Sequence, residues 1–284
     1  MGSYRDVGSA FRVPLGFVPR LDLRTTEQYA GYVWRVGDSG AWSFGPGVSG
    51  VIDWDHADRL QDRWTTADFA VSLAGHLDAR VSRAEGYELF ATTPFQRNTT
   101  NVSFSSGALR WLSVWGLYSW GTAINYTPAA GVAPFLGSKQ GTYASVTVRP
   151  SARLHVEQIL LHEQLETMPG GVPVPKQPVF NTNIVRWKAN LQITRSLALR
   201  GIVDYNQLES EPSLFSQLGS SRLMGDVLVR YLLHPGTAVY VGFNNRYENL
   251  IVDPRSPTPI DHAGLPAFPV GQQIFVKVSY LFRF

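Results

Sequence analysis

The residues best suited to chemistry lie in one short stretch, where aspartates surround a histidine. Asp53 and Asp55 are two positions apart in a segment of strand period, so their carboxylates share a face, and His56, Asp58 and Asp62 follow. An oxygen-rich group of this kind suits Ca²⁺, with Asp53, Asp55 and Asp58 as ligands, although the loop glycine of an EF-hand is missing. The main expectation is solvated loop charge with no bound metal, and the calcium site and an Asp/His hydrolase site are the alternatives.

Two glycine-containing strings match motifs of enzymes. Gly45 to Gly50 reads G-P-G-V-S-G and fits G-x-G-x-x-G, but no helix follows to hold a pyrophosphate. Gly37 to Gly40 reads G-D-S-G, as in the nucleophile segment of trypsin-like proteases, without the flanking histidine base and carboxylate. We therefore predict that the first string is part of a strand and the second a hairpin turn.

Strands must position these residues, because side chains alternate with a period of two along most of the chain and no helical period is convincing. Residues 223–233 and 237–247 both alternate, and His234-Pro235-Gly236 joins them as a tight turn. Residues 185–193 and 197–205 form a second hairpin of this type. One face is apolar and the other polar, which predicts a lumen. The charged positions predicted to face it are Arg186, Lys188, Arg200, Asp204, Asp226, Arg230, Arg246 and Lys277.

The connections between these strands alternate between short turns and long joins. Short turns include Thr194 to Ser196, and long joins include Ala91 to Asn98 and Thr127 to Gln140. Short periplasmic turns and long extracellular loops produce this pattern. The prediction is an all-β fold, an antiparallel transmembrane β-barrel of about 14 strands that starts at Tyr4 to Val13, or else the C-terminal part of a larger barrel.

Composition excludes several classes of protein. The mean hydropathy of -0.08 and the lack of any apolar run of about 18 residues exclude a helical membrane protein. A net charge of +3 without a basic cluster argues against nucleic acid as a partner. No signal peptide opens the chain, so either it is a fragment of a longer precursor, which we expect, or the outer-membrane interpretation fails.

The last eleven residues carry the strongest signal. Counting back in twos from Phe284 gives Phe282 and Tyr280 on one wholly apolar face. This aromatic ending resembles the C-terminal strand of bacterial outer-membrane β-barrels, which implies that Phe284, Phe282 and Tyr280 are an assembly signal read by the barrel assembly machinery.

Several longer stretches resemble one family. They are Gly16 to Arg24, Asn183 to Lys188, Leu199 to Asn206, His234 to Gly242 and Phe275 to Phe282, and together they are similar to the C-terminal region of the domain of unknown function 5916 family. The resemblance spans nearly the whole chain. It implies a membrane barrel that normally follows a carbohydrate-binding-like β-sandwich, and a family without an established activity. The sandwich is absent here, so any carbohydrate partner would belong to that missing domain.

The sequence thus predicts a single domain over residues 1–284, located in the bacterial outer membrane. The predicted role is non-enzymatic, as a pore or as the anchor of the missing domain, without a cofactor and with membrane lipid and lipopolysaccharide as partners. One alternative is an outer-membrane enzyme of protease or lipase type, which requires a histidine and a carboxylate or serine to converge at the extracellular mouth. The other is a soluble all-β binding protein.

Overall fold

The computed structural model describes residues 1–12, 20–37, 42–74, 76–169, 175–252, 259–262 and 264–281, with backbone alone for 250–252 and 259–262. All regular elements in these ranges are strands, so the all-β prediction is confirmed. None of these residues belongs to a helix capable of spanning a membrane. The strands are β1 (Gly2–Val7), β2 (Leu23–Gly31), β3 (Trp34–Val36), β4 (Trp42–Trp54), β5 (Leu60–Leu73), β6 (Leu77–Phe90), β7 (Thr93–Leu109), β8 (Leu112–Ile124), β9 (Leu136–Ser151), β10 (Leu154–Thr167), β11 (Pro178–Gln192), β12 (Leu197–Ser210), β13 (Ser220–His234), β14 (Thr237–Glu248), β15 (Leu250–Val252), β16 (Pro259–His262) and β17 (Phe268–Tyr280).

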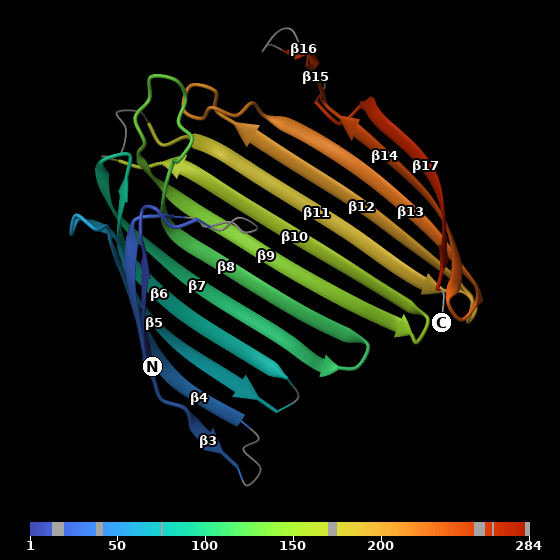
Figure 1. The fold of residues 1–284 in the computed structure, drawn as a ribbon, viewed down its shortest axis with the longest axis horizontal. Coiled ribbons are helices and arrows are strands. Elements are labelled where there is room, and N and C mark those ends of the chain that lie inside the picture. Colours follow the sequence, from blue (N-terminus) through green and yellow to red (C-terminus); the bar gives the residue numbers. More distant parts are fainter. Residues whose placement is uncertain are drawn as a thin grey trace. The chain divides into compact units, whose positions relative to one another are not determined.

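The strands form a meander in which almost every strand pairs with the next one in the chain (Figure 1). The hydrogen-bonded order runs from β1 through β2 and β4 to β14 and ends at β17, with β3 beside β4, giving a 15-stranded sheet. The small hairpin β15–β16 stands apart from this order. The predicted antiparallel fold and strand number therefore agree with the structure. The order has two ends among the described residues, so closure into a barrel stays a prediction.

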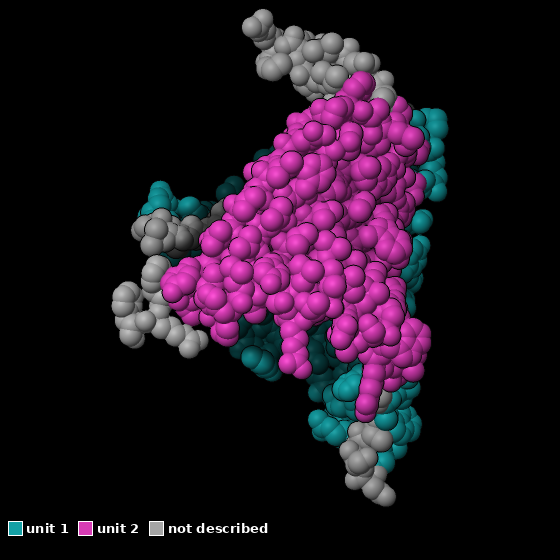
Figure 2. All heavy atoms as spheres, turned by 90° about the vertical axis from the view of Figure 1, so that its right-hand side faces the viewer, with its two compact units in different colours: residues 1–105, 117–140, 165–177 teal, residues 106–116, 141–164, 178–284 magenta. Residues whose placement is uncertain are grey.

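The chain divides into two compact units, coloured separately in Figure 2. Unit 1 comprises residues 1–105, 117–140 and 165–177, and unit 2 comprises residues 106–116, 141–164 and 178–284. Strands β1 to β6 belong to unit 1 and β11 to β17 to unit 2, while β7 to β10 contribute to both.

The strand register in unit 2 sorts side chains onto two faces. One cross-strand row contains Leu191, Leu199, Val229, Val241 and Val276, each paired with the next. A neighbouring row on the opposite face is mostly polar and charged, and it consists of Gln192, Ala198, Arg230, Tyr240 and Lys277. Side chains alternate along a strand, so the register places all the charged residues predicted to face the lumen on this second face. They are Arg186, Lys188, Arg200, Asp204, Asp226, Arg230, Arg246 and Lys277.

Some predicted boundaries were wrong. The long join expected at Ala91 to Asn98 is a two-residue turn, because Ala91 and Thr92 both have positive φ, 46° and 69°, the geometry of a type I′ hairpin. The sequence there lacks the Asn-Gly or Asp-Gly pair that usually signals this turn. The first strand is Gly2–Val7 rather than Tyr4 to Val13.

The G-x-G-x-x-G string is structural, as predicted. It lies inside β4, where the backbone of Tyr32 crosses close to Gly45 and the Tyr32 amide donates to the Pro46 carbonyl at 3.0 Å. A Cβ atom on Gly47 would lie 2.7 Å from an Asp68 carboxylate oxygen. These two glycines let neighbouring segments approach β4 closely, which is a packing role.

Candidate functional site

The loop between β4 and β5 is organised by one buried carboxylate. Asp55 Oδ1 accepts hydrogen bonds from the backbone amides of Ala57 and Arg59 at 3.0 and 2.9 Å, and its Oδ2 accepts from Arg59 Nε at 2.7 Å. The Arg59 backbone bond is the largest of the causes that lower the pKa of Asp55. These contacts consume the lone pairs that a metal would use, so Asp55 acts as a loop brace.

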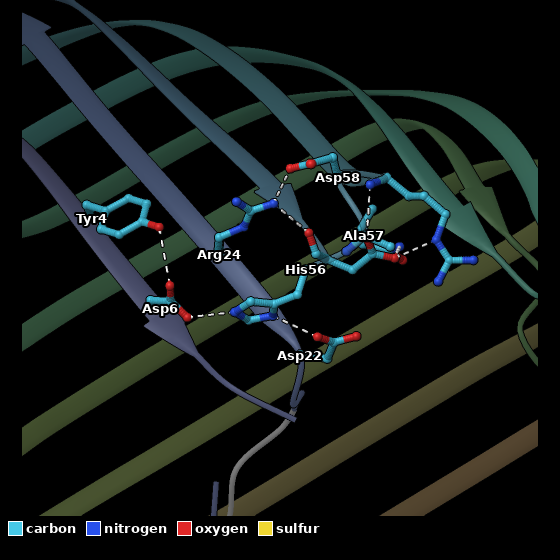
Figure 3. Close-up of polar contacts among 10 residues, drawn as sticks. Tyr4, Asp6, Asp22, Arg24, His56, Ala57 and Asp58 are labelled. Atoms are coloured by element: carbon cyan, nitrogen blue, oxygen red, sulfur yellow. Dashed lines mark hydrogen bonds and ion pairs between the residues drawn. The ribbon is translucent and has the colours of Figure 1, made fainter. Parts of the chain in front are cut away.

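His56 projects from the same loop and lies between two carboxylates (Figure 3). Its Nδ1 is 2.7 Å from Asp22 Oδ1 and its Nε2 is 2.9 Å from Asp6 Oδ1. A neutral imidazole has one N–H, so both contacts are hydrogen bonds only when the ring is protonated. The bonds to Asp22 and then Asp6 accordingly raise the pKa of His56. The ring thus ties together β1, the start of β2 and the β4–β5 loop.

Asp53, Asp55 and Asp58, the candidate ligands of the calcium alternative, are not grouped as metal ligands in the structure. Within the described ranges no three acidic, histidine or cysteine side chains are grouped so as to hold a metal ion. Asp58 instead pairs with Arg24 Nη2 at 2.5 Å, and the same Nη2 donates to the Asp55 carbonyl oxygen at 2.8 Å (Figure 3). Local arginines and backbone amides thus satisfy Asp55 and Asp58.

A cavity of about 760 Å³ opens on the charged face of unit 2, at the end where the short turns lie. Its lining comes from the β7–β8 turn, from the adjoining ends of β9 and β10 with the turn between them, and from strands β11 to β14. Five arginines line it and no carboxylate does; they are Arg110, Arg149, Arg153, Arg200 and Arg230. The lining also contains aromatic and neutral polar side chains, which are Trp111, Tyr240, His155, Asn190 and Gln192.

The arginines of this cavity are only partly neutralised by the protein. Arg200 Nη2 lies 3.5 Å from Asp226 Oδ1, while Arg200 Nε is buried without a hydrogen-bond partner among the described residues. Arg149 Nη1 donates to Ser113 Oγ at 3.2 Å, which leaves its charge uncompensated. No described carboxylate forms an ion pair with Arg110, Arg153 or Arg230. The cavity therefore carries excess positive charge.

Sequence reasoning found only part of this cavity. Arg200 and Arg230 were predicted to face the lumen, whereas Arg110, Arg149 and Arg153 were not singled out because they lie in or beside turns. The signal that could have found them is their position. All three stand at or beside short connections of one predicted end, next to strands whose charged face carries arginine and lysine.

Four more of the charged positions predicted to face the lumen take part in ion pairs; they are Arg186, Asp204, Lys188 and Arg246. Arg186 Nε donates to Asp204 Oδ2 at 2.9 Å, and Asp204 is 3% exposed. Lys188 lies 3.9 Å from Glu157. Arg246 Nε and Arg222 Nε both lie near Glu248 Oε1, at 3.5 and 2.9 Å respectively. Lys277 pairs in register with Tyr240 at the edge of the cavity.

The predicted assembly signal falls mostly outside the described residues. Phe282 and Phe284 are beyond them, while Tyr280 ends β17, where it pairs with Thr237 and is exposed. The assembly role of this stretch stays a prediction.

Comparison with known proteins gives structural likenesses alone. No family model matches the chain and no curated protein matches it, so the resemblance to the 5916 family also stays a prediction. Among solved structures, outer-membrane expressed OmpT of Vibrio cholerae matches at 7% identity over 93% of this chain and 99% of that chain, with a TM-score of 0.36. An in-vitro folded OmpT, an outer membrane protein of Vibrio cholerae, matches at 6% identity over 93% and 98%, with a TM-score of 0.37. The NanC porin matches at 8% identity over 90% and 99%, with a TM-score of 0.34.

The prediction that the chain is not an enzyme was wrong as argued. The enzyme alternative required a histidine and a carboxylate or serine to converge, and the structure brings His56 into contact with Asp6 and Asp22. The exclusion is withdrawn. At this level of identity no residue role is transferred from those proteins.

Proposed function

We propose that this chain forms a β-barrel of the bacterial outer membrane and that its charged face lines a passage for small water-soluble solutes. The observation that carries the proposal is the separation of the two faces. In unit 2 the apolar row through Val229, Val241 and Val276 lies on one face, and the charged residues lie on the other.

The apolar face supports a lipid environment because its large side chains are uncovered. Val241 is 44% exposed and Ile274 is 74% exposed, and Trp187, Val203, Val227 and Phe243 on the same face are exposed as well. Soluble monomers seldom expose a contiguous apolar patch above a few hundred Å². Hydrocarbon of a membrane would remove this face from water.

Strand length and aromatic placement support the same environment. Strands β11, β12 and β13 have 15, 14 and 15 residues, more than the roughly 9 to 11 that a tilted strand needs to cross a bilayer. In unit 1, Trp34 stacks on Phe44 with ring centroids 5.4 Å apart, and Tyr32 meets Trp34 at 4.9 Å. The exposed rings of Tyr32 and Trp34, with Phe44 packed beside them, suit a membrane interface, where aromatic girdles form.

The charged face supports a hydrated passage rather than a dry core. Its ion pairs, such as Arg186 with Asp204, alternate with Asn244, Gln273 and other neutral polar side chains. Burying so many polar groups in an apolar interior would be costly, whereas water solvates those that lack a protein partner.

The test is to express the protein behind a secretion signal in a Gram-negative host, purify it and follow it in three assays. We expect it in the outer-membrane fraction, with a heat-dependent change of gel mobility in detergent, and stepwise conductance in planar bilayers. A monodisperse form without detergent would contradict the membrane proposal. Heat-modifiable protein that gives no conductance would contradict the passage.

We also propose that the barrel assembly machinery recognises Phe284, Phe282 and Tyr280 and inserts the chain among lipid and lipopolysaccharide. The support is the aromatic alternation of the terminal sequence. Deleting Phe284 should sharply lower the inserted amount in cells, while refolding into detergent stays close to normal. Equal yields in cells would remove the signal interpretation.

A further inference from the structure

We infer that the cavity of unit 2 binds a small organic polyanion, a solute that carries carboxylate or phosphate groups. The inference deepens the proposed function, on which it rests for the idea that such a solute passes along the charged face. Binding itself is a property of the cavity and can be measured without transport.

Charge is the first ground. Five arginines surround one space of about 760 Å³ that no carboxylate lines. Each keeps its charge at any physiological pH, so the mutual repulsion cannot be relieved by losing a proton. The ion pair of Arg200 with Asp226 offsets one of these charges. An anionic ligand would offset the others.

Strand register is the second ground, because it brings further donors into the same rows. Gln192, Ala198, Arg230, Tyr240 and Lys277 follow one another across the strands from β11 to β17. The adjacent row on the same face contains Asn190 and Arg200, followed by Leu228, Gly242 and Phe275. Cationic and amide donors from two neighbouring rows thus converge on the same part of the face.

The donor geometry favours planar oxyanions. A guanidinium presents parallel N–H groups that match the two oxygens of a carboxylate or phosphate, a fit that a simple halide ion cannot use. Arg200 Nε is buried without a hydrogen-bond partner among the described residues, so its N–H group is available to donate to an oxygen atom of a bound anion. The site is therefore suited to oxyanions rather than to anions in general.

The volume of the cavity and its uncharged lining residues limit the kinds of ligand that fit. Sites for small organic ligands are commonly about 300 to 1,000 Å³. Trp111 and Tyr240 offer aromatic surface, and Asn190, Gln192 and Ser151 offer hydrogen-bonding groups for hydroxyls. A tricarboxylate or a sugar phosphate matches this combination of charge, size and polarity.

The phosphate group of a membrane lipid is an oxyanion that arginine can bind in the same way as the phosphate or carboxylate group of a soluble ligand. The experiment therefore compares three probes by titration calorimetry with the folded protein in non-ionic detergent: citrate, glucose 6-phosphate and dihexanoylphosphatidylglycerol. Glucose serves as the uncharged control. Binding of citrate and glucose 6-phosphate without glucose would support a solute site. Binding of the short-chain lipid alone would support an oxyanion site but would contradict the inference that its ligand is a small soluble polyanion.

The decisive variant is the double substitution Arg153→Gln with Arg230→Gln, which removes two charges that no described carboxylate neutralises. We expect it to weaken citrate binding by about 10-fold or more, because charge-assisted hydrogen bonds are the strong ones. The matched control is Arg246→Gln, which lies on the same face but outside the cavity and leaves Glu248 paired with Arg222. The control should bind citrate like the unmodified protein.

Heat-dependent gel mobility and the β-sheet circular dichroism of each variant show whether it has folded. Absence of binding to every anionic probe by the folded protein would overturn the inference, and so would an equal loss of citrate affinity in Arg246→Gln. Conductance without citrate binding would contradict the proposed anion site but not the proposed solute passage. Citrate binding without conductance would contradict the proposed solute passage but not the proposed anion site.

Discussion

A Cβ atom on Gly45 would lie 1.8 Å from the carbonyl oxygen of Tyr32. No flexible side chain is involved, so the backbone itself would have to move. We therefore expect Gly45→Ala to lower the free energy of unfolding by roughly 1 to 3 kcal/mol, the usual cost of overpacking. Urea unfolding in detergent, followed by tryptophan fluorescence, measures it.

Gly50→Ala is the matched control for Gly45→Ala in the same strand and the same motif. The nearest atom to its Cβ would be the Trp64 carbonyl oxygen at 3.8 Å, an ordinary contact. This variant should unfold close to the unmodified protein. Similar losses at both positions would contradict the packing role of Gly45.

The two faces of β14 give a second prediction. Val241 lies in the exposed apolar row and Asn244 on the charged face. If the apolar face meets lipid near mid-membrane, Val241→Arg should destabilise the folded protein by roughly 2 to 4 kcal/mol, and Asn244→Arg by much less. Refolding equilibria in lipid vesicles compare them, and equal losses would show that the faces are misassigned.

The His56 contacts predict a dependence on pH. The two carboxylates raise the ring pKa above its ordinary value of 6.5. The stabilising effect of the protonated ring is therefore complete below pH 6.5 and is lost as the pH rises through the raised pKa. Nuclear magnetic resonance of the His56 ring should show a midpoint above 6.5. Asp22→Asn should lower that midpoint, and an unchanged midpoint in this variant would contradict the contact.

Tyr126 provides a prediction at alkaline pH. Desolvation of the half-exposed phenol, followed by its hydrogen bond to Glu88, raises the pKa of this loop residue to about 12. The contribution of the neutral phenol to stability is complete below pH 10 and is lost as the pH approaches 12. The difference in phenolate absorbance between the unmodified protein and Tyr126→Phe isolates its titration. A midpoint near 10 would show that the side chain is solvated.

The candidate sites were predictable to different degrees. Asp55 and His56 stand out in the sequence by residue type and spacing. Their roles depended on Arg59, Asp6 and Asp22, and the last two are far from His56 along the chain. Charge pairs are formed by whichever partner the fold brings near, so a calcium site and a histidine held by carboxylates look alike in sequence.

The sequence by itself determined the class of fold and the division of side chains between two faces. A period of two is a local property of the strand, and a hairpin turn such as His234 to Gly236 fixes which residues pair across it. The alternation of Val229 with Arg230, and of Val241 with Tyr240, could therefore be read directly.

Only the tertiary structure decided where the charge accumulates. Arg110, Arg153 and Arg230 come from two turns and a strand that are separated along the chain, and the sheet order of unit 2 gathers them around one cavity. The sequence does not contain this clustering because it depends on the registers of several strand pairs at once. Likewise, the approach of Tyr32 to Gly45 follows from backbone geometry that no side-chain pattern encodes.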